Sequence, residues 1–189
     1  MKTAVLIHGM PSKEEYLNPK ADSQSNCHWF PWLQQQLLTN GILAHTPEMP
    51  KPYEPVYKDW KREFERYDLN EDTTLVGHSC GGGFLVRYLS ETQDVKVGQV
   101  VLVAPWTDEE KSLNTGMFDF EVDPSFIERT AGTTIFHSTN DDQAMHDTVN
   151  MLRAKVPNIG YKEFENHGHF CLKDMNTREF PELLEALLG

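Results

Sequence analysis

The sequence has few cysteines, few basic residues and no long apolar run, and each shortage excludes a class of protein. Its cysteines are Cys27, Cys80 and Cys171, an odd number without metal-type pairing, which is typical of reduced thiols in a cytoplasmic protein. The 17 Lys and Arg against 29 Asp and Glu give a net charge of −12, which argues against nucleic acid or an anionic membrane as a partner. No apolar run approaches the roughly 20 residues needed to span a bilayer, so we expect no membrane insertion.

The overall composition is that of a globular protein. Hydrophobic residues make up 39% of the 189 residues and aromatic residues 11%, which is enough for a sizeable core. The chain shows no internal repeat, low-complexity tract or interdomain linker, and it is too short for two ordinary domains. We therefore expect a single domain over residues 1–189.

Short apolar runs alternate with segments of helical period along the chain. The expected strands are Ala4–His8, Ile42–His45, Thr74–His78, Gln99–Ala104, Thr133–His137 and Gly160–Phe164. The expected helices are Trp29–Thr39, Tyr57–Tyr67, Gly83–Ser90, Ala144–Lys155 and Arg178–Leu188. Near-continuous apolar runs are typical of strands that are covered on both faces. The alternation predicts an α/β fold with a mostly parallel sheet of about six strands and helices on both faces.

The stretch Leu75–Gly83 reads LVGHSCGGG and brackets Ser79 with Gly77 and Gly81. This Gly-x-Ser-x-Gly pattern, between an apolar strand and a helical segment, is typical of a nucleophile elbow. The sharp turn strains the backbone of the serine, and side chains two residues to either side would collide. A glycine-rich loop with an incidental serine would show the same letters, but the strand and the helix around it favour the elbow.

A serine hydroxyl becomes an effective nucleophile only when a base takes its proton and an acid orients that base. His169, in the run Gly168-His169-Phe170 near the C-terminus, is the expected base, and His167 is a neighbour in the same loop. Asp141 and Asp142 follow a predicted strand, so either could be the acid while the other caps the next helix. The spacing to that helix favours Asp142, whereas the distance from the strand end favours Asp141, and we expect Asp142.

Backbone N–H groups near the serine would stabilise the oxyanion of the tetrahedral intermediate. We expect the N–H of Cys80 to be one donor and that of Met10 or Gly9 to be the other, because both loops follow strands that lead to the site. The Cys80 side chain should point into the fold. His167 and His169 could instead bind a metal ion with Cys171 as the third ligand. No carboxylate lies at ligand spacing, so we expect neither metal nor cofactor.

Seven segments together resemble the small serine hydrolases related to retinoblastoma-binding protein 9. They are VLIHG, HWFPWLQQQL, PEMPKP, LVGHSCGG, VLVAPW, STNDDQ and GHF, which follow one another in the family order over nearly the whole chain. The resemblance implies the three-layer α/β-hydrolase fold without a cap domain, with Ser79 as nucleophile, His169 as base and the aspartate pair as acid. The polar segment Met10–Asn26 is longer than its usual counterpart, which indicates a reshaped entrance to the site.

These observations predict a carboxylesterase-type serine hydrolase that acts on a small-molecule ester or related acyl compound. The alternative is a protein-interaction module on a hydrolase fold with a vestigial site, because fold alone does not determine function. A protein partner is therefore left open. We expect four aromatic side chains to line the site if they do not pack in the core, namely Trp29, Trp32, Phe118 and Phe120.

Overall fold

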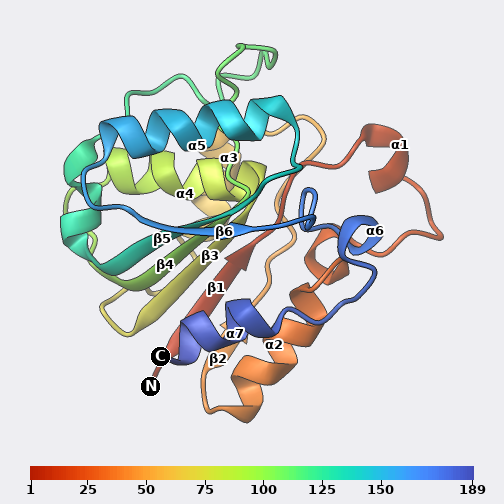
Figure 1. Ribbon diagram of the computed structural model, residues 1–189, viewed down its shortest axis with the longest axis horizontal. Helices are drawn as coiled ribbons and strands as arrows, with labels where there is room; N and C mark the ends of the chain where they lie inside the picture. The colour runs from red at the N-terminus through yellow and green to blue at the C-terminus, as the bar shows by residue number, and fades with distance from the viewer.

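The computed structural model describes residues 1–189, and its centre is one six-stranded sheet. The strands are β1 (Thr3–Ile7), β2 (Leu43–His45), β3 (Thr73–His78), β4 (Val97–Val103), β5 (Thr130–Ser138) and β6 (Gly160–Phe164). They lie in the order β2-β1-β3-β4-β5-β6, and every neighbouring pair is parallel. The predicted parallel α/β sheet is confirmed, and Figure 1 shows the strands side by side through the middle of the molecule.

Helices cover both faces of this sheet. They are α1 (Lys13–Tyr16), α2 (Phe30–Thr39), α3 (Tyr57–Phe64), α4 (Cys80–Glu91), α5 (Gln143–Lys155), α6 (Leu172–Met175) and α7 (Pro181–Leu188), with 3-10 helices η1 (Gln24–Asn26) and η2 (Pro124–Arg129). Figure 1 shows α3, α4 and α5 on one face, α2 and α7 on the other, and the short helices α1 and α6 beyond the carboxyl end of β1. These layers form the α/β-hydrolase fold, and the segment between β4 and η2 contains no helix or strand.

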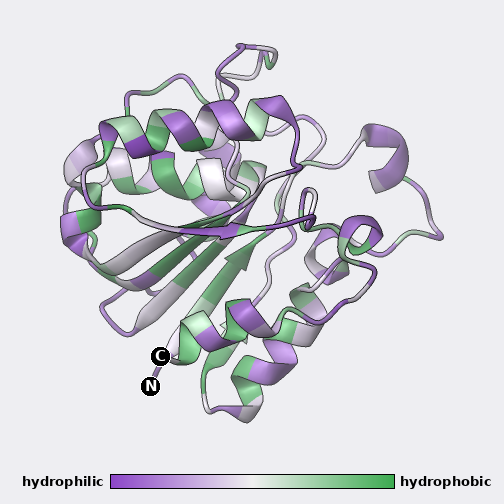
Figure 2. Cartoon of the chain, viewed as in Figure 1, coloured by the Kyte–Doolittle hydropathy of each residue, from purple (hydrophilic) through white to green (hydrophobic).

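Alternate residues of each strand enter two separate hydrophobic cores. On β1, Val5 and Ile7 pack beneath α3, α4 and α5, whereas Ala4 and Leu6 pack beneath α2 and α7. Figure 2 accordingly shows hydrophobic colour along the central strands and hydrophilic colour over α1. Burial on both faces explains why the strands appear in the sequence as continuous apolar runs.

The predicted elements differ from the observed ones mainly at their ends. Strand β6 has the predicted bounds, but α4 begins directly after Ser79 rather than at Gly83. Glycine has a low helix propensity, so the sequence did not indicate the first turn of α4. Helix α1 was not predicted because it has four residues, none of them buried, and its cap is a local bond from the Glu15 N–H to Ser12 Oγ.

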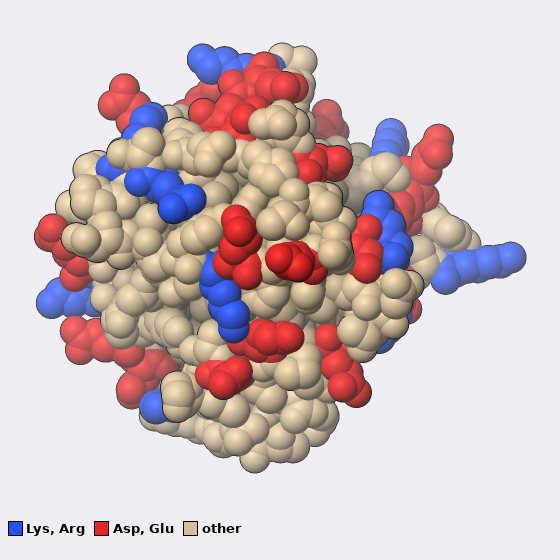
Figure 3. Space-filling model, viewed as in Figure 1, with Lys and Arg blue, Asp and Glu red and all other residues tan.

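The surface carries the charge that the composition implies. Figure 3 shows acidic side chains scattered over one face with single basic side chains between them, and this face has no broad basic patch.

All three cysteines are free thiols, and the cytoplasmic location stays a prediction. No helix combines the length and the apolar character required to cross a membrane.

Candidate active site

Ser79 lies at the sharp turn between β3 and α4. Its backbone angles are φ 54° and ψ −122°, in the region that a residue with a side chain rarely adopts, at a cost of about 1–3 kcal/mol. Three hydrogen bonds hold this conformation: the Ser79 N–H donates to the carbonyl of Val103 (2.9 Å), and the Ser79 carbonyl accepts from the N–H groups of Gly83 and Trp106 (both 3.1 Å). The expected strained elbow is therefore present in the backbone.

The glycines on either side of the serine are needed because other backbone atoms approach them closely. A Cβ on Gly77 would lie 2.6 Å from the carbonyl oxygen of Gly81. A Cβ on Gly81 would in turn lie 2.6 Å from the carbonyl oxygen of His8, in the loop after β1. This steric reason is the one that the pattern predicted.

The imidazole of His169 meets the carboxylate of Asp141. His169 Nδ1 lies 3.0 Å from Oδ1 and 3.1 Å from Oδ2 of Asp141, whose side chain is 1% exposed. A carboxylate can only accept, so the proton of the imidazole is on Nδ1 and Nε2 carries the lone pair that a general base requires.

The prediction that Asp142 would contact His169 is wrong. Asp142 occupies the N-cap position of α5, its residue is exposed, and its side chain makes no capping bond. The reason is a tight turn after β5, in which the Asp141 N–H donates to the carbonyl of Ser138 (3.3 Å) and the Asp141 side chain reaches the His169 ring. The Asp142 N–H then donates to Asp141 Oδ1 (2.8 Å) and fixes that carboxylate.

The loop that carries His169 is held by residues that the sequence analysis missed. Asn140 Oδ1 accepts from the N–H of Gly168 (2.8 Å), and Asp174 accepts from the N–H of His169 (3.2 Å). His78, the residue before Ser79, donates from Nε2 to the carbonyl of His169 (2.8 Å). Burial lowers the pKa of His78 well below its ordinary value, so the ring stays neutral. The strand before the nucleophile thus anchors the backbone of the histidine, a contact between distant residues that no local pattern signals.

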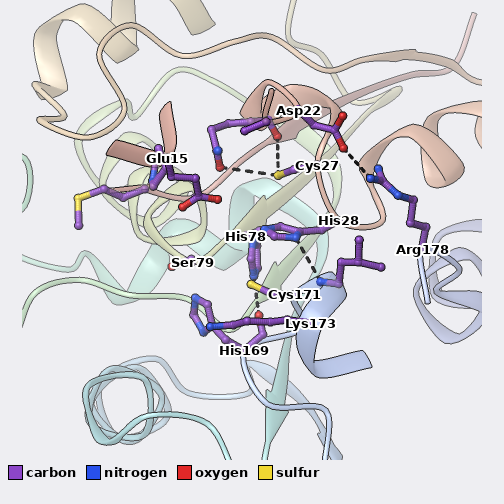
Figure 4. Close-up of a pocket in the computed structure, with 16 residues that line it drawn as sticks. Glu15, Asp22, Cys27, His28, His78, Ser79, His169, Cys171, Lys173 and Arg178 are labelled. Atoms are coloured by element: carbon purple, nitrogen blue, oxygen red, sulfur yellow. Dashed lines mark hydrogen bonds and ion pairs between the residues drawn. The ribbon is translucent and has the colours of Figure 1, made fainter. Parts of the chain in front are cut away.

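Ser79 and His169 line the same cavity of about 620 Å³, which Figure 4 shows in close-up. Residues of the polar segment 10–26 form much of its wall, and residues 171–178 form another part. An ion pair between Asp22 and Arg178 joins these two segments at the cavity. The segment Met10–Asn26 therefore lines the cavity, and its reshaping of the entrance stays a prediction.

The four aromatic residues that were expected at the site do not line this cavity. Trp29 is fully buried and stacks on Phe30 with ring centroids 4.2 Å apart, and Trp32 packs against the same core. Phe118 and Phe120 pack against the opposite core. Core packing on α2 and near α4 therefore decides the position of these side chains.

The expected oxyanion donors lie beside Ser79. Cys80 is the first residue of α4, so its N–H has no acceptor within the helix, and the N–H of Met10 has no backbone acceptor. Gly9 permits the close approach of its loop, because a Cβ there would lie 3.1 Å from the Cβ of Ser79. The Cys80 thiol is fully buried in the core, as expected, and burial raises its pKa.

Two other histidines near the site, His8 and His167, have structural contacts. His8 is 1% exposed, accepts from the N–H of Met49 at Nε2 (2.9 Å), and donates from Nδ1 to the carbonyl of Gly9 (2.8 Å). His167 Nδ1 meets the carbonyl of Glu165 (2.8 Å) rather than Asp141. No group of three or more His, Cys, Asp or Glu side chains is arranged to hold a metal ion.

Comparisons with known proteins show the family and the fold of this chain. The sequence matches the family model described as "Serine hydrolase" over residues 18–187. It is 30% identical to the YdeN protein of Bacillus subtilis over 188 residues, which cover 93% of this chain and 95% of YdeN. The crystal structure of the B. subtilis ydeN gene product has a TM-score of 0.77 at 26% identity and covers 100% of this chain and 97% of that one. An esterase from Exiguobacterium antarcticum, EaEST, has a TM-score of 0.66 at 15% identity, covers 100% and 91% of the two chains, and supports the fold alone.

Proposed function

This chain belongs to the serine hydrolase family, and on that premise we propose that it hydrolyses small acyl esters through a triad of Ser79, His169 and Asp141. The observation that carries the proposal is the contact of the buried Asp141 carboxylate with Nδ1 of His169. It assigns the tautomer that leaves Nε2 free to accept a proton, in a cavity that also contains Ser79.

The proposed reaction is acyl transfer to water in two steps. His169 Nε2 removes the Ser79 proton while Oγ attacks the ester carbonyl, and the resulting imidazolium returns that proton to the departing alcohol. Water then attacks the acyl-serine with the same base, which releases the acid and restores Ser79. Asp141 holds the ring and stabilises its positive charge throughout.

The N–H groups of Cys80 and Met10 are the proposed donors to the oxyanion that forms on the carbonyl oxygen. Both follow a strand that ends at the site, and the N-terminus of α4 adds its positive dipole end. Rigid donors of this kind need no reorganisation as charge develops, which is why they favour the transition state over the ester.

The cavity supports a small and partly polar substrate. Most of its lining residues are polar or charged, among them Glu15, Gln24, Lys173 and Arg178. A carboxylester is the proposed substrate class, because a serine with a histidine base and a buried carboxylate is the set of groups that acyl transfer requires. We also propose that, within the family, this chain is related to retinoblastoma-binding protein 9, on the strength of the HWFPWL, PEMPKP and GHF segments.

Hydrolysis of p-nitrophenyl butyrate by purified protein tests the proposal. We expect the Ser79→Ala variant to lose about 10⁴-fold or more in kcat, because removal of the nucleophile leaves only the contribution of the oxyanion donors and binding. Ser125→Ala, the same change at a serine that does not line the cavity, is the matched control and should keep wild-type activity. A Ser79→Ala variant that retains a tenth of the turnover would rule out Ser79 as nucleophile.

A further inference from the structure

His28 lies in the cavity wall and has an unusual backbone conformation. It precedes α2, lines the same cavity as Ser79, and has a positive φ of 52°. Non-glycine residues are held in this region only where surrounding contacts require it, and such positions cluster at functional sites.

Its hydrogen bond to α6 defines which ring nitrogen carries the proton. The backbone N–H of Leu172, the first residue of α6, donates to His28 Nδ1 at 3.2 Å. Nδ1 is therefore an acceptor, and the ring proton must be on Nε2. Burial, together with the nearby His169, lowers the pKa of His28 to about 4, so the ring is neutral near pH 7.

The Nε2–H group of His28 has no partner within the protein. The one hydrogen bond of its side chain is at Nδ1, and Nε2 is not among the buried polar atoms without a partner. It is therefore open to solvent, and the solvent space that His28 reaches is the cavity, where Figure 4 labels it among the lining residues. By contrast, the ring nitrogens of His8 and Nε2 of His78 are bonded to protein groups.

The ring is also fixed in orientation. It packs edge-on against His78, with ring centroids 5.7 Å apart and an interplanar angle of 79°. A neutral donor of fixed direction is suited to bind an oxygen acceptor, because no side-chain ordering is required when the acceptor arrives.

We propose that His28 donates a hydrogen bond through Nε2–H to an oxygen atom of the substrate, so that the enzyme selects esters that carry an ether, hydroxyl or carbonyl oxygen near the scissile bond. This inference rests on the proposed esterase function. His28 acts as a substrate-binding residue and takes no part in proton transfer.

Two substitutions separate this role from the structural role of Nδ1. In His28→Asn, the amide oxygen occupies the place of Nδ1, and asparagine tolerates a positive φ, so the bond from Leu172 is kept while the donor at Nε2 is lost. In His28→Gln, the amide nitrogen reaches the place of Nε2 and restores the donor. Thermal unfolding of both variants checks that the fold is retained.

The experiment compares two pairs of isosteric esters in which one CH₂ is replaced by oxygen. They are p-nitrophenyl butyrate with p-nitrophenyl methoxyacetate, and n-butyl acetate with 2-methoxyethyl acetate, so that both sides of the ester are sampled. For each enzyme, kcat/KM for the oxygen ester is divided by that for its hydrocarbon partner. We expect His28→Asn to lower this ratio about tenfold in one pair, mainly through KM, and His28→Gln to stay within about threefold of wild type.

Equal ratios in wild type and His28→Asn for both pairs would overturn the inference, as would an equal loss on both members of each pair. Labelling by a fluorophosphonate probe separates this failure from that of the proposed function. If Ser79 of the wild type is labelled and the ratios are equal, only the role of His28 is wrong. If Ser79 is not labelled, the esterase function is wrong and the role of His28 is wrong with it.

Discussion

The neighbouring carboxylates of Asp141 and Asp142 have the same chemistry and different surroundings. Asp141 is buried against the His169 ring, whereas Asp142 is exposed at the start of α5. Because one carboxylate controls the imidazole tautomer and the other does not, the pair allows a direct test of the proposed acid.

We expect Asp141→Asn to lower kcat about 10⁴-fold, because an amide N–H facing Nδ1 favours the wrong tautomer. Asp142→Asn is the matched control, since it removes the adjacent charge and should leave kcat within about threefold of wild type. Steady-state kinetics on p-nitrophenyl butyrate measures both. A larger loss of kcat in Asp142→Asn than in Asp141→Asn would show that Asp142 is the acid.

At the residue scale, the sequence predicted the site residue whose backbone conformation a motif requires. It did not predict the residues whose positions depend on contacts between distant parts of the chain. Ser79 could be predicted because the glycines around it are required by close backbone approach. The sequence could not show whether Asp141 or Asp142 contacts His169, because the turn after β5 determines which of the two side chains reaches the ring. His28 and His78 were missed as site residues, since their partners lie 144 and 91 residues away in the sequence.

At the element scale, the turn after β5 and the loop after β6 form one unit that holds the proposed acid and base together. Asn140 joins them, since its Oδ1 accepts from the Gly168 N–H (2.8 Å) and from the Ser138 hydroxyl (2.8 Å). Strands β5 and β6 are neighbours in the sheet, so the two loops leave it side by side. The position of His169 therefore depends on the loop before α5 as well as on its own.

We expect Asn140→Ala to lower kcat about tenfold and to cost about 1 kcal/mol of unfolding free energy, because the Gly168 N–H loses its acceptor and the ring of His169 is less well oriented. Asn140→Asp keeps the acceptor oxygen and should retain most of the stability. Urea unfolding and kinetics on the same samples provide both numbers. An Asn140→Ala enzyme with wild-type kcat would show that this bond does not position the base.

The strands and the longer helices could be predicted because each buries apolar side chains at a recognisable period. Strand β6 was placed to the residue, and the other strand ends lie within a few residues of the expected ones. The short helices α1 and α6 bury no residue, so they have no apolar period to detect. They form around the cavity through capping bonds such as that from Leu172 to His28.

At the scale of the whole molecule, the protein keeps several histidines neutral in its interior. Burial lowers the pKa values of His8, His28, His78 and His137 below their ordinary value of 6.5, in the case of His28 to about 4. An unfolded chain binds protons at these sites more tightly than the folded one does. The contribution of these histidines to the unfolding free energy is therefore fully present above about pH 6.5. It is lost as the pH falls towards their pKa values in the folded protein.

We expect the unfolding free energy to decline between about pH 6.5 and 4, with an upper limit of about 3 kcal/mol from His28 alone. Urea unfolding at a series of pH values measures this decline. The His28→Asn variant should show a shallower slope over the same range, because one of the titrating groups is absent. A wild-type unfolding free energy that is constant from pH 7 to 4.5 would contradict the buried neutral state of these rings.

In the proposed mechanism, Ser79 is the nucleophile and is activated by His169 and Asp141. The most direct measurement is labelling of the native protein by a fluorophosphonate probe, with the modified residue located by peptide mass spectrometry. We expect a single phosphonylated residue, Ser79, with labelling absent in Ser79→Ala and strongly slowed in Asp141→Asn. No labelling, or a label on another residue at the same rate in all three proteins, would contradict it.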